Sequence, residues 1–390
     1  MQRTRSFLIS SILLAVLVGM FLTSGAARAA SSAPKITCGQ WNYVSSPSLT
    51  NGGFFNDVAA ISSTDAWAVG WYYDSNNLSR TLIEQWNGTS WSIIPSPNQG
   101  NVGDVLKGIA AVSSTDVWAV GGYEDSNYLY HTLVEQWNGT SWSIIPSPDK
   151  GSYGGELSGI AALSATNIWA VGNYDIYAGT LVEQWNGSQW SIVPSKSSIY
   201  GAGLNSIAAL SAKNVWAVGF SLDSSRIDHT LIEHWNGKKW KTVTSPNITG
   251  NDNFLNGVAA ISGKDVWADG ESSNSSSNTT QTLIEQWNGT QWSIVASPNP
   301  SSTFLNLSGM AAVSSTNIWA VGFYQDSSFN TYALIEKWNG TQWNIVPISI
   351  PEATYSTLSG VARIPGTSDL WSVGTFAQYS GDQTLTAYYC

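Results

Sequence analysis

Nine aromatic residues stand shortly after a recurring WAVG-like motif in this 390-residue chain, where they could take part in ligand binding. They are Trp71, Tyr72, Tyr73, Tyr123, Tyr174, Phe220, Phe323, Tyr324 and Phe376. Short acids recur close by, at Asp74, Asp125, Asp175, Asp223 and Asp326. Flat aromatic rings beside carboxylates could hold a neutral glycan by stacking and hydrogen bonding. The alternative is structural, with rings that cover the rim of the fold and acids that cap turns.

Three charged residues depart from the repeated pattern. Asp269 replaces the valine of one WAVG motif, Glu271 follows it, and Arg363 replaces an alanine in another copy. Because an unpaired buried charge is costly, we expect Asp269 and Arg363 to reach water, in a central channel. All three are candidates for ligand binding, or for acid–base chemistry if the protein is a hydrolase or lyase.

Other kinds of catalytic site fit the sequence poorly. The three histidines, His131, His229 and His234, have the character of surface substitutions, so we expect no metal site and no cofactor. One glutamate recurs in six copies of the repeat, which favours a scaffold role over a catalytic pair. These glutamates are Glu84, Glu135, Glu183, Glu233, Glu285 and Glu336. We assign no catalytic residue.

A sevenfold repeat positions these residues. The first tryptophan of the WAVG-like motif recurs at 67, 118, 169, 216, 267, 319 and 371, a period of about fifty residues that indicates an array of one supersecondary unit. The repeat contains four short β-rich runs, and the Asn-Gly dipeptide found in six of the copies predicts a tight hairpin of type I′. The 21 tryptophans occupy three fixed repeat positions, with Trp71 as the exception. That regularity predicts packing between units rather than binding.

The chain ends favour a closed ring over an open stack of units. The seventh copy supplies three strands, and residues 41–47 (WNYVSSP) align without a gap on residues 91–97 (WSIIPSP). We therefore predict an all-β fold, a seven-bladed β-propeller of four-stranded antiparallel blades. In this fold the N-terminal strand completes the last blade and closes the ring.

The two cysteines lie at the seam of this ring. In the repeat frame Cys390 aligns with Asn87, and Cys38 aligns with Gly88, the adjacent position at the same hairpin tip. We predict a Cys38–Cys390 disulfide rather than two free thiols. Such a bond forms in an oxidising compartment.

The N-terminal segment offers a route to that compartment. Two arginines precede an apolar run over residues 7–22, and small residues near 27–29 offer a cleavage site. We predict a signal peptide over 1–30, a short linker over 31–37 and the propeller over 38–390. An uncleaved membrane anchor is the alternative. Both routes place the propeller outside the cell, either secreted or associated with the cell surface.

The charge of the chain limits its partners. The net charge of −10 becomes −13 without residues 1–30, because that segment holds three arginines and no acid. This balance argues against nucleic acid as a partner, and against an anionic membrane once the signal is removed. Charged residues make up only 11% of the chain, and its neutral polar surface suits an extracellular protein. We expect a monomer whose partner is a glycan or an extracellular protein.

Residues 118–123 (WAVGGY), followed by residues 132–148 (TLVEQWNGTSWSIIPSP), resemble the kelch unit. The chain is similar to secreted kelch-like and galactose-oxidase-like propellers with WAVG and WNG repeats, which are common in soil bacteria. That family has no agreed activity, so the resemblance implies a fold but not a reaction. The copper ligands of galactose oxidase have no counterpart here, and Arg80, Arg226 and Arg363 match the arginine triad of sialidases poorly.

Three functions remain open on these grounds. The first is a secreted, non-enzymatic propeller that binds a ligand or protein through the long variable loops of one face. The second is a polysaccharide-active hydrolase or lyase on the same scaffold. The third is a purely structural surface protein.

Overall fold

The computed structural model describes residues 36–390, except 48, 176, 196–199, 275, 278, 301–303 and 379–380. The predicted signal peptide and nearly all of the predicted linker lie outside the described residues. The described residues form 28 β-strands. None of their segments is a helix long and apolar enough to cross a membrane.

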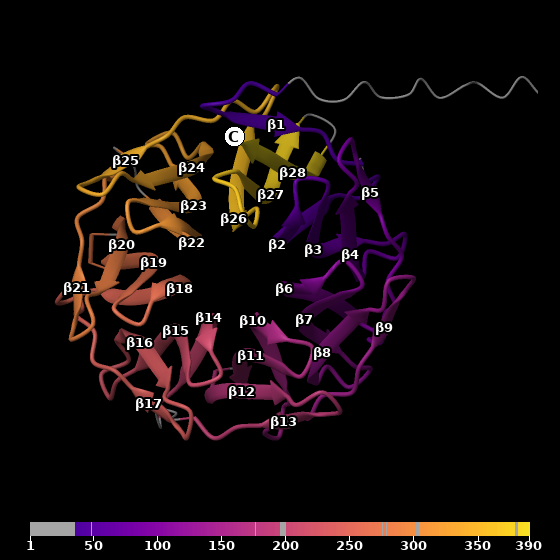
Figure 1. The fold of residues 1–390 in the computed structure, drawn as a ribbon, viewed down its shortest axis with the longest axis horizontal. Coiled ribbons are helices and arrows are strands. Elements are labelled where there is room, and N and C mark those ends of the chain that lie inside the picture. Colours follow the sequence, from indigo (N-terminus) through magenta and orange to yellow (C-terminus); the bar gives the residue numbers. More distant parts are fainter. Residues whose placement is uncertain are drawn as a thin grey trace, which may run out of the picture. The chain divides into compact units, whose positions relative to one another are not determined.

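The strands are arranged as seven blades around a central axis, and each blade counts its strands one to four from the axis outward (Figure 1). The first strands are β2 (Gly53–Ser62), β6 (Gly103–Ser113), β10 (Gly155–Ser164), β14 (Ala202–Ser211), β18 (Asp252–Ser262), β22 (Phe304–Ser314) and β26 (Tyr355–Arg363). The second strands are β3 (Asp65–Tyr73), β7 (Asp116–Glu124), β11 (Asn167–Tyr174), β15 (Asn214–Leu222), β19 (Asp265–Asn274), β23 (Asn317–Gln325) and β27 (Leu370–Gln378).

The outer half of each blade has the same regularity. The third strands are β4 (Ser79–Trp86), β8 (Tyr130–Trp137), β12 (Gly179–Trp185), β16 (Asp228–Trp235), β20 (Thr279–Trp287), β24 (Thr331–Trp338) and β28 (Gly381–Tyr389). The fourth strands are β5 (Trp91–Ile93), β9 (Trp142–Ile144), β13 (Trp190–Ile192), β17 (Trp240–Thr242), β21 (Trp292–Ile294), β25 (Trp343–Ile345) and β1 (Trp41–Val44). Blades one and two share an eight-stranded sheet, joined by the single bridge between Ser79 and Gly103.

The two faces of the ring differ in their loops. We call the side with the connections between the second and third strands, and between successive blades, the variable face. We call the opposite side, with the turns from first to second and from third to fourth strand, the short-turn face. In blade two, residues 125–129 lie on the variable face, and residues 114–115 and 138–141 on the short-turn face.

The seam of the ring confirms the predicted closure. Strand β1 pairs antiparallel with β28, and Trp41 stands opposite Tyr389 as Trp91 stands opposite Trp86 in blade one. A disulfide joins Cys38 to Cys390, and the Gly39 amide donates to the Cys390 carbonyl oxygen over 2.7 Å. Both ends of the propeller are therefore fixed in one blade.

The Asn-Gly hairpins form as predicted, but the predicted turn type is wrong. A type I′ turn needs a positive φ at both residues, and in blade one only Gly88 has it, at +95°. Four residues separate Trp86 from Trp91, and Asn87 Oδ1 accepts hydrogen bonds from the amides of Thr89 and Ser90. The asparagine therefore serves as a side-chain cap of a longer turn.

Tryptophan packs each blade against the next, as the repeat predicts. Trp67 of blade one is fully buried and contacts Trp137 and Trp142 of blade two, with ring centroids 5.0 and 5.5 Å apart. The same triad recurs at every blade boundary. The others are Trp118–Trp185–Trp190, Trp169–Trp235–Trp240, Trp216–Trp287–Trp292, Trp267–Trp338–Trp343, Trp319–Tyr389–Trp41 and Trp371–Trp86–Trp91.

The blades approach one another most closely at a β-bulge in each first strand. The bulge residue is followed by glycine in five blades, by Asp57 in blade one and by Ser206 in blade four. A Cβ atom on Gly309 would lie 3.1 Å from the Ser359 carbonyl oxygen of the next blade. A small residue is therefore favoured at this position, where neighbouring blades come closest.

The recurrent glutamates of the third strands are fully buried. They lie on the face of the sheet that packs on the preceding blade, and most of their carboxyl oxygens have no hydrogen-bond partner among the described residues. Burial raises the pKa of Glu84, Glu183, Glu285 and Glu336 to about 8. These carboxyls are therefore mostly protonated at neutral pH.

Removal of the seam disulfide should destabilise the ring. The bond spans 352 residues of sequence, and the chain-entropy model gives about 5 to 6 kcal/mol for a loop of that length, as an upper figure. We expect a Cys38→Ser/Cys390→Ser variant to unfold at lower urea concentration than the wild type. Reductant should lower the wild type to the same midpoint and leave the variant unchanged. Two free thiols in the native protein would contradict the bond.

The buried glutamates should make stability fall as pH rises. Each folded-state pKa near 8 exceeds the ordinary value of 4.5, so the folded state holds protons that the unfolded state releases between these values. We expect the unfolding temperature to decline from about pH 5 to about pH 8.5. Glu285→Gln should flatten this decline, whereas Glu124→Gln on the variable face should not. Equal pH profiles for wild type and E285Q, measured by calorimetry, would refute the assignment.

Candidate functional site

The nine predicted aromatic residues lie on the second strands near the variable face, and most are only partly accessible. Phe220 is 9% exposed and Phe376 is 3% exposed, so these two belong to the packed interior. The other seven are half-buried. Trp71 stacks on Phe54 at 4.2 Å. These contacts place the rings as support beneath the loops, and their role in binding stays a prediction.

The recurring acids cap turns, as the structural alternative proposed. In blade one, Asp74 Oδ1 accepts hydrogen bonds from the amides of Asn76 and Leu78. Three other blades repeat this arrangement, with Asp125, Asp223 and Asp326 as the capping residues. Asp175 differs, because its Oδ1 accepts from the amide of Tyr153 in the preceding inter-blade loop. These carboxylates are used by the scaffold.

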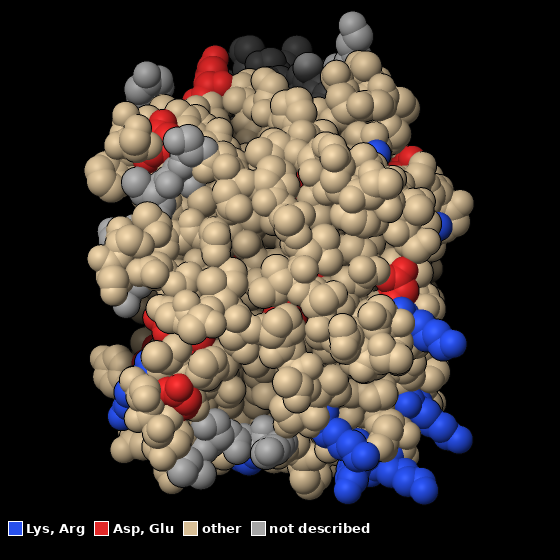
Figure 2. Space-filling model, turned by 90° about the vertical axis from the view of Figure 1, so that its left-hand side faces the viewer, with Lys and Arg blue, Asp and Glu red and all other residues tan. Residues whose placement is uncertain are grey.

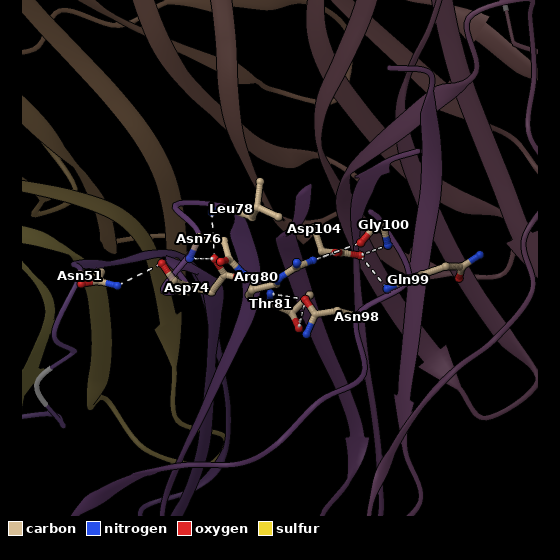
Figure 3. Close-up of polar contacts among 10 residues, drawn as sticks. All are labelled: Asn51, Asp74, Asn76, Leu78, Arg80, Thr81, Asn98, Gln99, Gly100 and Asp104. Atoms are coloured by element: carbon tan, nitrogen blue, oxygen red, sulfur yellow. Dashed lines mark hydrogen bonds and ion pairs between the residues drawn. The ribbon is translucent and has the colours of Figure 1, made fainter. Parts of the chain in front are cut away.

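Arg80 is held between two carboxylates rather than presented to solvent (Figure 3). Its Nε donates to Asp74 over 3.0 Å, and its Nη1 donates to Asp104 and to the Gly100 carbonyl oxygen. Asp104 is fully buried, and it also accepts from the amides of Gln99 and Gly100. Arg80 thus links the capped turn of blade one to the loop that leads into blade two.

Histidine takes the place of Arg80 in blades two and four. His131 Nδ1 lies 2.6 Å from Asp149, and His229 Nε2 lies 3.0 Å from Asp223. His234 lies at the other end of its strand, 2.8 Å from Asn214 Oδ1. Within the described residues, no cluster of three or more His, Cys, Asp or Glu side chains is arranged to hold a metal ion.

Asp269 is completely buried, so the prediction that it reaches water is wrong. It stands opposite Gly257 in the pairing of β18 with β19, and the missing side chain of that glycine leaves room for the carboxyl group. In blade one the same cross-strand pair is reversed, with Asp57 opposite Val69. Burial raises the pKa of Asp269 to about 7, and the nearby amides of Gly257 and Asp269 offset it only partly.

The three charged candidates do not form one site. Glu271 lies on the same side of β19 as Asp269, facing blade six, where Asn306 is its hydrogen-bonding neighbour. Arg363 is exposed at the short-turn end of β26, and it donates to the carbonyl oxygens of Thr367 and Val313. Arg363 is exposed, as predicted, but it is not among the described residues that line the central channel, and it lies on the opposite face from the variable loops.

The described residues also form a pocket of about 360 Å³ on the variable face, between blades two and three, which sequence reasoning missed. We call it the tyrosine pocket. It is lined by Lys107, Tyr130, Gly154, Gly155, Glu156, Asn173 and Tyr177. Tyr130 is 42% exposed and Tyr177 is 46% exposed. Two accessible rings from neighbouring blades therefore flank one hollow.

The chain positions both rings through its backbone. Gly154, at φ +74°, passes so close to the Tyr130 carbonyl oxygen that a Cβ atom would overlap it. Tyr177 adopts φ +69°, a conformation rare for a bulky residue. Its carbonyl oxygen accepts from the Ala202 amide, and its ring rests on Phe220 at 5.5 Å. Tyr177 is thus held between blades three and four, and strained residues of this kind cluster at binding sites.

Polar groups line the pocket beside the rings. Lys107 occupies the bulge of β6, and its Nζ lies 2.6 Å from Glu156 Oε2 on β10. Asn173, 5% exposed, stands opposite Glu156 on β11. Burial raises the pKa of both tyrosines, with smaller contributions from the charge of Glu124 at Tyr130 and from that of Glu156 at both. The phenols therefore stay neutral and can donate hydrogen bonds.

The pocket adjoins the mouth of the central channel. The channel forms a second hollow of about 230 Å³ among the bulge residues of all seven first strands, and Lys107 lines both. Asn56, Asn205 and Asn256 each donate from Nδ2 to a carbonyl oxygen of the next blade there. Three of the seven bulge residues at the channel wall are therefore already used in bonds between blades.

One signal in the sequence could have revealed the tyrosine pocket. Tyr128, Tyr130, Tyr153, Tyr177 and Tyr200 all fall in or beside the variable loops of blades two to four. Each is at least 42% exposed. These tyrosines lie outside the fixed repeat positions, so alignment of the copies places them in no common column.

Sequence comparisons do not assign the chain to a family. No protein-family model matches it, and no curated protein is significantly similar to it. The kelch-like resemblance is therefore not confirmed at the level of family.

Solved structures support the fold. A YCF48 protein bound to a D1 peptide is 14% identical, with 92% of this chain and 100% of that chain covered and a TM-score of 0.54. A PL25 ulvan lyase bound to a GlcA(1-4)Rha3S chain is 9% identical, with 87% and 95% covered and a TM-score of 0.55. A GH74 xyloglucanase from Xanthomonas campestris is 12% identical, with 88% and 55% covered and a TM-score of 0.53. At such identities the likeness establishes the β-propeller and leaves the function open.

Replacement of Asp269 by the repeat residue should stabilise the protein. Asp269→Val creates the Gly–Val pair found in blade six at Gly309 and Val321, and it removes a buried carboxyl. Because the folded-state pKa of about 7 exceeds the ordinary 3.8, the gain should be larger at pH 8 than at pH 5, about 1 to 3 kcal/mol at pH 8. Urea denaturation at both pH values measures it.

The matched control is Val321→Asp, which should destabilise blade six most strongly at pH 8. Loss of ligand binding by a well-folded D269V would instead support Asp269 as a binding residue. Destabilisation of D269V at pH 8 would contradict the packing argument.

Proposed function

We propose that this protein is a secreted, non-enzymatic β-propeller that binds a neutral glycan in the tyrosine pocket. The observation that carries the proposal is the pair of exposed rings, Tyr130 and Tyr177, from neighbouring blades on either side of a polar hollow. The volume of about 360 Å³ lies within the range of ordinary ligand sites. A rigid ring of blades holds both tyrosines in place before the ligand arrives.

The chemistry of the pocket suits a sugar. Apolar faces of a pyranose ring stack on aromatic rings, and its hydroxyl groups both donate and accept hydrogen bonds. Glu156 accepts, Lys107 donates, and the amide of Asn173 can do both. Because Lys107 and Glu156 are already paired at 2.6 Å, they neutralise each other. A neutral glycan therefore fits better than a charged one.

Binding without turnover is better supported than catalysis. The acid of the pocket is paired with Lys107, and Asp269 and Arg363 lie away from it. The nine aromatic residues predicted from the repeat, together with Glu271, are proposed to contribute as a supporting layer or as secondary contacts. One of the nine rings, that of Tyr174, is already covered by Lys150, whose Nζ lies 4.0 Å from the ring centre. Release of product from a polysaccharide panel would favour the hydrolase or lyase alternative instead.

The setting of the protein is part of the proposal. The Cys38–Cys390 bond supports an oxidising compartment, consistent with export through the predicted signal peptide. We also propose a kelch-like affiliation and a bacterial source, on the WAVG and WNG motifs. A monomer is expected because the ring is closed at the seam, and a protein partner on the variable face is the alternative to a glycan.

Glycan binding should depend on the two pocket tyrosines. We expect a glycan array to identify a neutral ligand, and Tyr130→Ala or Tyr177→Ala to weaken its binding about tenfold or more, by calorimetry. Tyr332→Ala, an exposed tyrosine of blade six, is the matched control and should bind as the wild type does. Unchanged affinity in Y130A and Y177A, with both variants folded, would exclude the pocket.

A further inference from the structure

A second departure from the repeat concentrates lysine on the short-turn face. Lys213 and Lys264 stand where blades one, two, three and six carry threonine. Lys238, Lys239 and Lys241 fill the third-to-fourth-strand turn and the fourth strand of blade four, in the sequence NGKKWKT. Blade two has NGTSWSI at that place. Five of the ten lysines of the chain therefore lie in two adjacent blades.

The fold places these side chains on the same face of two adjacent blades (Figure 1). The stem of Lys213 lies over Gly237, where an added Cβ atom would be 2.7 Å from its Cγ. This contact places Lys213 directly beside the turn that carries Lys238 and Lys239. Lys264 lies over Gly289 of blade five in the same way. We call these five residues, Lys213, Lys238, Lys239, Lys241 and Lys264, the lysine patch.

The lysine patch is accessible, and the scaffold does not use its charges. All five residues are exposed. Across the described residues none of their ammonium groups forms an ion pair or a side-chain hydrogen bond. Figure 2 shows blue side chains gathered at one edge of the ring, whereas the rest of this view is mostly uncharged. By contrast, Lys337 of blade six is engaged over the ring of Trp319.

The opposite face carries the opposite charge. Most acids outside the interior lie in or beside the variable loops, at Asp74, Glu124, Asp125, Asp149, Glu156, Asp175, Asp223, Asp228, Asp252, Asp326, Glu352 and Asp382. The short-turn face has acids in blades one, two, five and seven, at Asp65, Asp116, Asp265 and Asp369. A positive area on a protein of net negative charge would attract an anionic partner to this one edge.

Partly exposed tryptophans stand beside the lysines. Trp235 donates its Nε1 to the Ala212 carbonyl oxygen, next to Lys213, and Trp287 donates to the Gly263 carbonyl oxygen, next to Lys264. Both indoles are half-buried, with an edge at the surface. Indole surfaces suit sugar rings, and ammonium groups suit carboxylate or sulfate substituents. The combination therefore favours a charged polysaccharide over an anionic polymer without sugar rings.

We infer that the lysine patch is a binding site for an anionic polysaccharide. The chain of such a polymer would run along blades four and five, with its acidic groups at the lysines and its rings against the indole edges. A flat anionic membrane fits less well, because a plane laid on the whole short-turn face would also meet the acids of blades one, two and seven. This site is independent of the tyrosine pocket, which lies on the other face.

The test uses the intact disulfide-bonded protein with polygalacturonate and heparin as probes, and dextran as the neutral control. We expect binding to both acidic polymers and not to dextran, with loss of binding as salt approaches ~1 M, where the Debye length is about 3 Å. Lys238→Gln/Lys239→Gln should weaken binding about tenfold. Thr140→Glu/Ser141→Glu makes the same charge change at the same positions of blade two, and it should have little effect.

Several outcomes would overturn the inference. Equal losses in K238Q/K239Q and T140E/S141E would show a response to net charge rather than to this patch. Absence of binding to both polymers would exclude the site, and so would binding to vesicles that contain anionic lipid but not to the polymers. Y130A/Y177A should retain binding to the acidic polymers. The proposal for the tyrosine pocket and the proposal for the lysine patch can therefore fail independently of each other.

Discussion

The contact between neighbouring blades is the interaction on which this structure depends. A single four-stranded blade cannot cover either of its faces, and each buries them only against the blades on both sides. The tryptophan triads make that contact the same at every boundary, with one buried ring from one blade and two aromatic rings from the next. At the seam the chain ends supply two members, Trp41 and Tyr389. Closure of the ring is therefore a condition for burial of the first and last blades.

Closure of the ring also limits which side chains fit at the central axis. Seven first strands converge, and the position after each bulge meets its counterpart on the next blade. Two blades nevertheless carry a carboxyl group here, Asp57 in blade one and Asp269 in blade five. Asp57 accepts from the amides of Val58 and Ile109, the latter in the next blade. Asp269 fills similar space from the second strand because Gly257 leaves it empty. Both acids take part in the contact between neighbouring blades, which argues against an active site at the axis.

The sequence was sufficient for the architecture because the fold is set by features that recur. Seven copies, the strand shared at the seam and the paired cysteines all follow from alignment of the repeat with itself. Side-chain exposure does not follow, because it depends on what lies above each residue in the irregular loops. Phe220 and Trp71 have equivalent positions, opposite Thr230 and Thr81, yet Phe220 is buried beneath Tyr177 and Trp71 is only half-buried. Asp269 was misjudged for a related reason, since its burial depends on the absence of a side chain at Gly257, on the neighbouring strand.

Function in such a protein has to be sought where one copy differs from the others. The residues that recur from blade to blade already have structural roles: tryptophan packs between blades, aspartate caps turns in four blades, and the third-strand glutamates are buried. What remains is local, namely tyrosines in the variable loops of blades two to four and lysines in the turns of blades four and five. These two sets lie on opposite faces, and no described residue belongs to both. Because the ring between them is rigid and closed, a ligand on one face need not displace a ligand on the other. If both proposals hold, the protein would connect a neutral glycan to an acidic one, and that function would require two surfaces but no catalytic group.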